Sequence, residues 1–186
     1  MINQGFISMI RKINAIISVL LILIILIHGI AGSTVLLGIS YFSFKWLAWI
    51  GIFLLIIHIF IGIKFTINSI AISNSHIKNY FRKNILFWIR RITGFGLIVL
   101  IFFHLGIYGQ VIDGTYVVFK FTTINMISQM LLIIFLFIHI CSNINPLLIS
   151  LGISNGFERK RKIFLILSSI TLFLIMSILL YYISWL

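Results

Sequence analysis

Long apolar runs separated by short polar segments dominate the chain. A membrane-spanning helix needs roughly 20 apolar residues, because each adds about 1.5 Å of rise across a hydrocarbon core about 30 Å thick. The runs are apolar on every face, without the alternating polarity of strands in a membrane barrel. The sequence therefore predicts five transmembrane helices, at about residues 13–37, 46–70, 85–108, 124–149 and 163–185.

The composition supports a membrane protein over a soluble one. Of the 186 residues, 62% are hydrophobic and only 9% are charged, which is more apolar surface than a soluble domain of this length can bury. A single cysteine, Cys141, excludes a disulfide framework and a CxxC metal site. We therefore expect residues 1–186 to form one all-α integral membrane domain, a five-helix bundle.

The net charge of +12 would fit a nucleic-acid-binding protein, but its distribution does not. The basic residues form short clusters between apolar runs, as in the cytoplasmic loops of membrane proteins. Because these clusters lie on one side, we predict a cytoplasmic N-terminus, a C-terminus outside, the lipid bilayer as environment and no nucleic-acid partner. Twelve basic residues fall on the predicted inner side (Arg11, Lys12, Lys64, Lys78, Arg82, Lys83, Arg90, Arg91, Arg159, Lys160, Arg161, Lys162) and two on the other (Lys45, Lys120).

Each of the first four predicted spans contains one histidine. A histidine in a bilayer costs free energy unless it has a partner. A single such histidine is about as often a core residue bonded to a neighbouring helix as it is a functional ligand. A proton relay normally uses acidic residues in the spans, whereas the only acidic residues here are Asp113 and Glu158, in connections. A mostly apolar ligand that accepts neutral imidazole fits better, and bis-histidine haem is such a ligand. The four histidines are His28, His58, His104 and His139.

The depths of the histidines sort them into two pairs. His28 lies 16 positions after Lys12 and His104 lies 13 after Arg91, which gives rises of about 24 Å and about 20 Å from the inner edge. His58 and His139, on helices that run the other way, each lie about 9 Å from that edge. We therefore predict two b-type haems, an outer one held by His28 and His104 and an inner one held by His58 and His139.

Basic residues near the inner level are candidates to bind haem propionates, which are anionic. Arg90 and Arg91 begin the third span and Lys64 follows His58. Their positive charges can pair with carboxylates. The alternative is that they only fix the topology. His76, in the connection between the second and third spans, is expected to be a loop residue and not a ligand.

The residues around the histidines resemble a known family. The third span, YFRKNILFWIRRITGFGLIVLIFFHLGIY, contains Arg91-Ile92-Thr93-Gly94 followed by His104. It resembles the third helix of the cytochrome b membrane anchor of succinate dehydrogenase and fumarate reductase, which shows an Arg-x-(Ser/Thr)-Gly motif and a distant ligand histidine. The first, second and fourth helices of that family are similar to IRKINAIISVLLILIILIHGI, HIFIGIKFTINS and HICSNINPLLISLGI. The likeness is to the single-subunit, five-helix, two-haem class.

The resemblance implies a role in respiration. It implies the quinone-reactive electron-transfer subunit of an oxidoreductase complex in the bacterial cytoplasmic (inner) membrane, working in the tricarboxylic acid cycle or in anaerobic respiration. A flavoprotein, which carries the dicarboxylate active site, and an iron–sulfur subunit would bind its cytoplasmic face, and menaquinone would be the usual quinone. The resemblance also allows a homo-oligomer of the whole complex. Tyr108, Gln110 and Asp113 are the quinone-site candidates near the outer haem, although Asp113-Gly114 also reads as a plain turn.

The chain departs from the family in one respect, and two other functions stay open. Fumarate reductases of this class can carry a membrane glutamate for proton return, whereas no predicted span here contains an acidic residue. The first alternative is a two-haem anchor of another dehydrogenase, of the hydrogenase, formate dehydrogenase or heterodisulfide reductase type. The second is a haem-free transporter or structural membrane protein, which should show broken helices; the only proline, Pro146, lies near a helix end.

Overall fold

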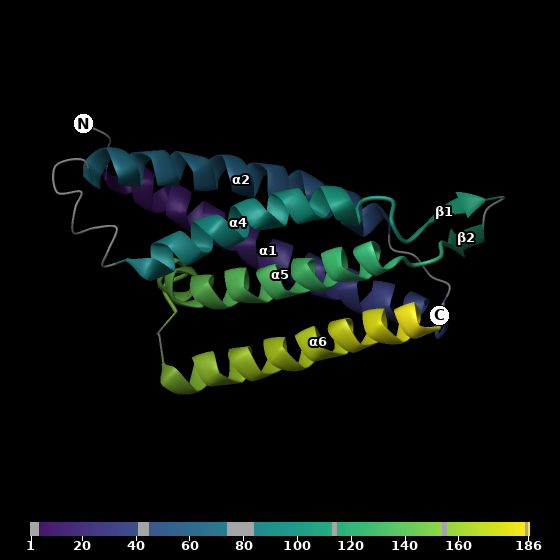
Figure 1. Cartoon of the computed structure of the whole chain (residues 1–186). Helices are drawn as coiled ribbons and strands as arrows, with labels where there is room; N and C mark the ends of the chain where they lie inside the picture. Colours follow the sequence, from purple (N-terminus) through teal and green to yellow (C-terminus); the bar gives the residue numbers. More distant parts are fainter. Residues whose placement is uncertain (1–3, 41–44, 74–83, 113–114, 154–155, 185) are drawn as a thin grey trace.

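The computed structural model describes residues 4–40, 45–73, 84–112, 115–153, 156–184 and 186. Each of its five helices contains a stretch long and apolar enough to cross a membrane, which confirms the predicted number of long apolar helices for this part of the chain. Successive helices run in alternating directions (Figure 1). The helices are α1 (Gln4–Leu36), α2 (Lys45–Ser73), α4 (Ile85–His104), α5 (Thr123–Ser150) and α6 (Phe157–Ile183).

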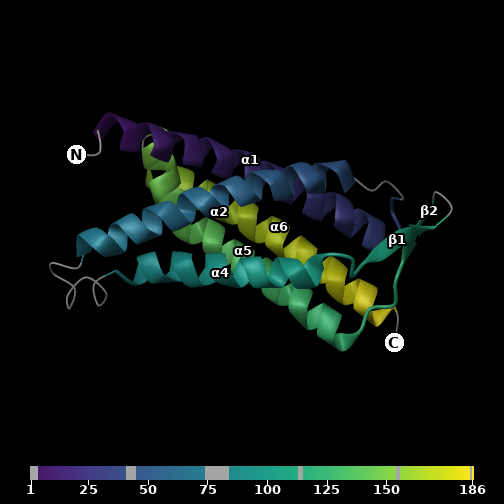
Figure 2. The same cartoon turned by 90° about the horizontal axis from the view of Figure 1, so that it is seen from above.

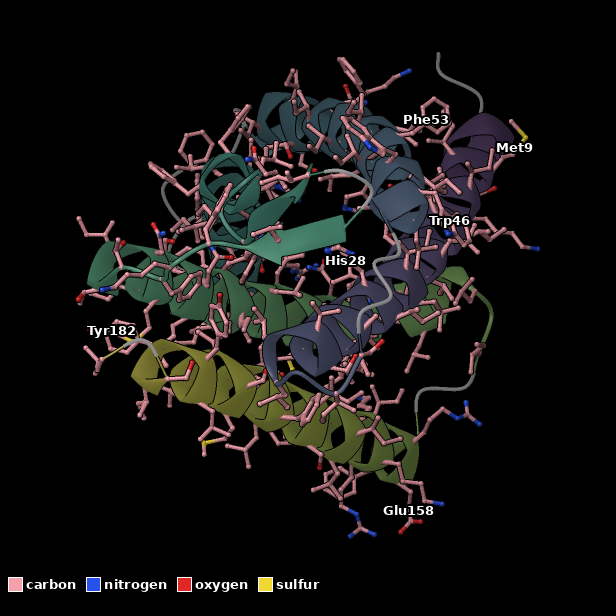
Figure 3. The ribbon with its side chains drawn as sticks, turned by 90° about the vertical axis from the view of Figure 1, so that its right-hand side faces the viewer. Met9, His28, Trp46, Phe53, Glu158 and Tyr182 are labelled. Atoms are coloured by element: carbon pink, nitrogen blue, oxygen red, sulfur yellow. The ribbon has the colours of Figure 1, made fainter. Side chains whose placement is uncertain are left out.

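Helices α1 and α5 hold the bundle together. Helix α1 packs against α2, α5 and α6, and α5 packs against α1, α4 and α6. A buried hydrogen bond ties α6 to α1, where the Ser177 hydroxyl donates to Ser33 Oγ over 2.8 Å. Large apolar side chains such as Met9 and Phe53 lie at the periphery (Figure 3) and are exposed. Such an apolar exterior suits contact with lipid.

The third helix ends at His104, so the predicted end at Tyr108 is wrong. Leu105 takes an extended backbone conformation (ψ 123°), and Gly106 follows with φ +76°, in the left-handed region that favours glycine. The chain then enters an unpredicted antiparallel hairpin, β1 (Gly109–Ile112) and β2 (Thr115–Val118). The hairpin lies beyond the helices at the end of the bundle where the C-terminus lies (Figures 1 and 2).

The other helices are longer than their apolar cores. Helix α1 begins at Gln4 instead of residue 13, and α6 begins at Phe157 instead of residue 163. In α6 the extra turn is polar and carries Glu158, whose carboxylate lies 3.4 Å from the guanidinium of Arg161. A hydropathy pattern marks only the apolar part of a helix, so the predicted span leaves out this polar turn of α6. In α1, the prediction stopped at the charged pair Arg11 and Lys12, whereas the helix continues through them.

The described basic residues keep the asymmetry seen in the sequence. The starts of α1, α4 and α6 and the ends of α2 and α5 share one end of the bundle (Figure 1). We call it the basic end, because most of the described cations lie there. Lys120 and the start of α2 at Lys45 belong to the opposite, hairpin end. The basic end contains Arg11, Lys12, Lys64, Arg90, Arg91, Arg159, Lys160, Arg161 and Lys162.

Candidate cofactor site

The structure brings His28 and His104 together. His28 comes from α1 and lies inside the ring of helices (Figure 3), and His104 is the last residue of α4. Their ring centroids are 6.0 Å apart, with an angle of 74° between the ring planes. A metal–imidazole bond is about 2 Å long, so two imidazoles bound on opposite sides of one metal atom have ring centres roughly 6 Å apart. The observed spacing fits one metal atom held by both rings.

A buried glutamine fixes the orientation of His104. The Oε1 atom of Gln129, on α5, lies 2.7 Å from His104 Nδ1 and also accepts a hydrogen bond of 3.1 Å from the Tyr108 hydroxyl. Gln129 is only 1% exposed. A carbonyl oxygen can only accept, so His104 must donate from Nδ1. Its Nε2 is then the unprotonated nitrogen that can bind a metal.

His58 and His139 line one cavity toward the basic end. The cavity has a volume of about 460 Å³, within the usual size of a ligand pocket. Its walls come from α1, α2, α4 and α5. Most of the lining is aliphatic, with Leu21, Leu55 and Leu97 among its residues. A largely apolar ligand therefore suits this space.

Hydroxyl groups hold the Nδ1 atoms of both inner histidines. Thr93 Oγ1 lies 3.1 Å from His139 Nδ1 and donates its own proton to the Ile89 carbonyl over 2.6 Å. Ser18 Oγ lies 3.3 Å from His58 Nδ1 and donates to the Asn14 carbonyl over 2.8 Å. With each hydroxyl proton directed to a carbonyl of its own helix, each oxygen is free to accept from a histidine Nδ1–H.

Three histidines thus share one arrangement: Nδ1 lies within hydrogen-bond distance of a side-chain oxygen, and donation from Nδ1 would leave Nε2 as the unprotonated nitrogen. Metal-bound histidines commonly donate their second ring N–H to such an oxygen, which fixes the tautomer and raises the basicity of the ligating nitrogen. A core histidine that serves only packing has no need to keep the same nitrogen available. The three residues are His58, His104 and His139.

The histidines come in pairs and not in larger metal-binding groups. Within the described parts of the chain, no cluster of three or more histidine, cysteine or acidic side chains could hold an ion. Two imidazoles are what an iron needs when a macrocycle supplies its other ligands, as in bis-histidine haem. The donor set therefore fits haem.

Polar and basic groups line the cavity as well. Arg11, Arg90 and Arg91 contribute to its wall. The side-chain oxygen of Asn14, which also lines the cavity, is buried without a hydrogen-bond partner among the described residues. Lys64, the third predicted propionate contact, is exposed and is not one of the described residues that line this space. The arginines could pair with the carboxylates of a bound macrocycle.

Glycines shape the inner site in different ways. A Cβ atom on Gly94 would lie 3.3 Å from Cε1 of His139, so Gly94 gives the imidazole its space. Gly62 lines the cavity and has nothing within 4 Å of where its Cβ would be. Gly96 and Gly29 instead admit Phe135 and Leu174 to their helices, which is close helix packing.

The three residues predicted for a quinone site do not lie together in the described structure. Tyr108 lies beside the outer pair, with its ring centre 5.3 Å from that of His104 and stacked on Phe121 at 5.4 Å. Gln110 is exposed on β1, opposite Val117 of β2. Asp113 lies outside the described residues, as does His76. Of the three, the structure shows Tyr108 in contact with a candidate haem ligand.

Sequence reasoning missed Gln129, Ser18 and Arg11. A glutamine inside a span is a signal, because polar side chains at membrane depth are costly and often functional. Ser18 and Arg11 carried no such mark.

Comparison with protein-family models, with curated proteins and with solved structures finds no match for this chain.

Proposed function

We propose that this chain is a multi-pass membrane cytochrome b that holds two haems and carries electrons across the bilayer. The observation that carries the proposal is the pair of histidine sites on four helices, with Nδ1 of His58, His104 and His139 each held by an oxygen. The 6.0 Å spacing of the His28 and His104 rings and the cavity lined by His58 and His139 support two separate centres.

In this proposal the protein positions the haems and sets their environment. Bound haem supplies one-electron chemistry at its iron. His28 and His104 would hold the outer haem, and His58 and His139 the inner one. Gln129, Thr93 and Ser18 would orient the ligating rings. The apolar lining keeps water from the inner site, and its arginines would face the propionates.

The partners follow from the resemblance of the sequence. We propose the anchor subunit of a succinate:quinone oxidoreductase or quinol:fumarate reductase, with the iron–sulfur and flavoprotein subunits at its cytoplasmic face and menaquinone as the membrane electron carrier. The concentration of described cations at the basic end supports a cytoplasmic location for that end and for the N-terminus, and an outer location for the C-terminus.

Replacement of single histidines tests the two-haem assignment. His58→Ala or His139→Ala in membranes that contain the full-length chain should each remove one b-type haem, measured as half of the reduced-minus-oxidised absorbance. His76→Ala, a histidine in a predicted connection, is the matched control and should change nothing. Unchanged haem absorbance in both His58→Ala and His139→Ala would contradict the inner site.

The soluble subunits that copurify with the chain test the choice of complex. A flavoprotein with succinate dehydrogenase or fumarate reductase activity is the expected partner. Copurification of hydrogenase, formate dehydrogenase or heterodisulfide reductase subunits instead would keep the cytochrome assignment and replace the complex.

A further inference from the structure

The Gln129 carboxamide is the most buried polar group next to either histidine pair. It is 1% exposed, and its Oε1 accepts from two donors, His104 Nδ1 at 2.7 Å and the Tyr108 hydroxyl at 3.1 Å. Burial of an amide at membrane depth is costly unless its hydrogen bonds are made. The cost is offset here by three groups of the protein that bond to this one side chain, from His104, Tyr108 and Ser128.

The hydrogen bonds of Gln129 fix which end of the amide faces the histidine. Its Nε2 donates to Ser128 Oγ over 3.1 Å, and the Ser128 hydroxyl donates its proton to the Asn125 carbonyl over 2.8 Å. Ser128 Oγ can therefore only accept from the amide. The oxygen of Gln129 is left to face His104 and Tyr108.

The two levels differ in the chemistry of the group that holds Nδ1. The inner acceptors, Thr93 and Ser18, are hydroxyls, which can rotate and can also donate. The outer acceptor is a carbonyl whose amide is held at both ends. Because His104 and Tyr108 both donate to the same oxygen, they compete for it, and no proton can pass between them through it.

We infer that Gln129 is the positioning residue of the outer haem: it holds His104 in the Nδ1–H tautomer, and Tyr108 tunes that bond by sharing the acceptor. This rests on the proposed function. A ligand imidazole that donates to a good acceptor is more electron-rich and favours the oxidised iron. Gln129 therefore lowers the potential of the outer haem, and Tyr108 partly opposes it.

Gln129 and Tyr108 are expected to change the midpoint potential of the outer haem in opposite directions, which makes the inference testable. Redox titration of the haem absorbance in membranes that contain the full-length chain should resolve two components. Gln129→Leu removes the acceptor and should raise the outer midpoint, with roughly a tenfold change in the reduction equilibrium expected from the loss of an outer-shell partner, or about 59 mV for one electron. Tyr108→Phe removes the competing donor and should lower the same midpoint by less.

Two further variants separate positioning from general damage. Gln129→Glu keeps an oxygen in place of Oε1 and should return the midpoint to that of the unmodified chain or below it. Thr93→Val removes an inner acceptor and should shift only the other component. Selective loss of the outer haem in Gln129→Leu also supports positioning. If Gln129→Leu does not accumulate, the Tyr108→Phe shift decides the question.

Failure of the inference is distinct from failure of the proposed function. No haem in the unmodified chain would remove the proposed function itself. Two haems whose midpoints do not respond to Gln129→Leu or Tyr108→Phe would leave the cytochrome in place and overturn the role of Gln129. A shift of both components together, or shifts of the same sign in the two variants, would also overturn it.

Discussion

The imidazole rings of His28 and His104 lie 6.0 Å apart, although one belongs to α1 and the other is the last residue of α4. Helices α1 and α4 are not packing partners along their length, since α1 packs against α2, α5 and α6. The contact between the two rings is therefore local to this level of the bundle. A shared metal atom would explain why the rings meet here.

Loss of either outer histidine should remove the same haem. We predict that His28→Ala, His104→Ala and the double variant each lose one of two b-type components, because both imidazoles would hold the same haem. Redox-resolved difference spectra of the three variants measure this. A double variant that lost more haem than either single variant would show that the two histidines do not act as a pair.

A side chain placed in the cavity should displace the inner haem. Gly62 lines the cavity and Gly32 is exposed on α1, and neither has an atom within 4 Å of where its Cβ would be. We predict that Gly62→Leu lowers inner haem content severalfold, whereas the matched Gly32→Leu has no effect. Haem per chain after purification gives the answer. Equal haem content in the two variants would mean that the cavity is not where the haem binds.

The arginines of the cavity should set the inner potential. Positive charge close to a haem favours the reduced iron, and buried charges are screened less than exposed ones. The double variant Arg90→Gln, Arg91→Gln should therefore lower the inner midpoint and leave the outer one unchanged. Lys64→Gln removes a charge from the same end of the bundle, from an exposed side chain that does not line the cavity, and should have little effect. If Lys64→Gln lowered the inner midpoint potential by as much, the shift would come from the total charge of the basic end and not from the arginines that line the cavity.

Close packing between α4 and α5 depends on Gly96. A Cβ atom on Gly96 would overlap the ring of Phe135, so Gly96→Ala forces either this ring or the two helices to shift. We expect a loss of about 1–3 kcal/mol in stability, as for overpacked cores. Thermal unfolding in detergent should show a lower midpoint for Gly96→Ala than for Gly32→Ala, which has open space. If the double variant Gly96→Ala, Phe135→Leu recovers the thermal unfolding midpoint of the unmodified chain, the loss of stability comes from this contact.

The number and order of the helices were predictable because hydropathy alone marks a membrane span. The end of the third helix was not. Apolar residues continue to Tyr108, but Leu105 and Gly106 adopt conformations that stop the helix at His104. The hairpin that follows had a signal in Asp113-Gly114, a dipeptide favoured in two-residue hairpin turns, between segments rich in β-branched residues. An isolated turn was the simpler interpretation.

The pairing of the histidines was predictable from depth, but their surroundings were not. Depth along a helix follows from residue counting, so His28 with His104 and His58 with His139 could be proposed from the sequence. Which side chain meets Nδ1 depends on helix rotation and on crossing angles. Gln129 and Thr93 reach their histidines from another helix. Arg11 lines the cavity and Lys64 does not, although both lie near the basic end.

The most direct test is a redox-titrated absorbance spectrum of the unmodified chain in its native membrane, together with the haem content per chain. The account predicts two b-type components with separate midpoints and two haems for each chain. Absence of haem from the purified protein would contradict it, and a single component at one haem per chain would remove one of the two sites.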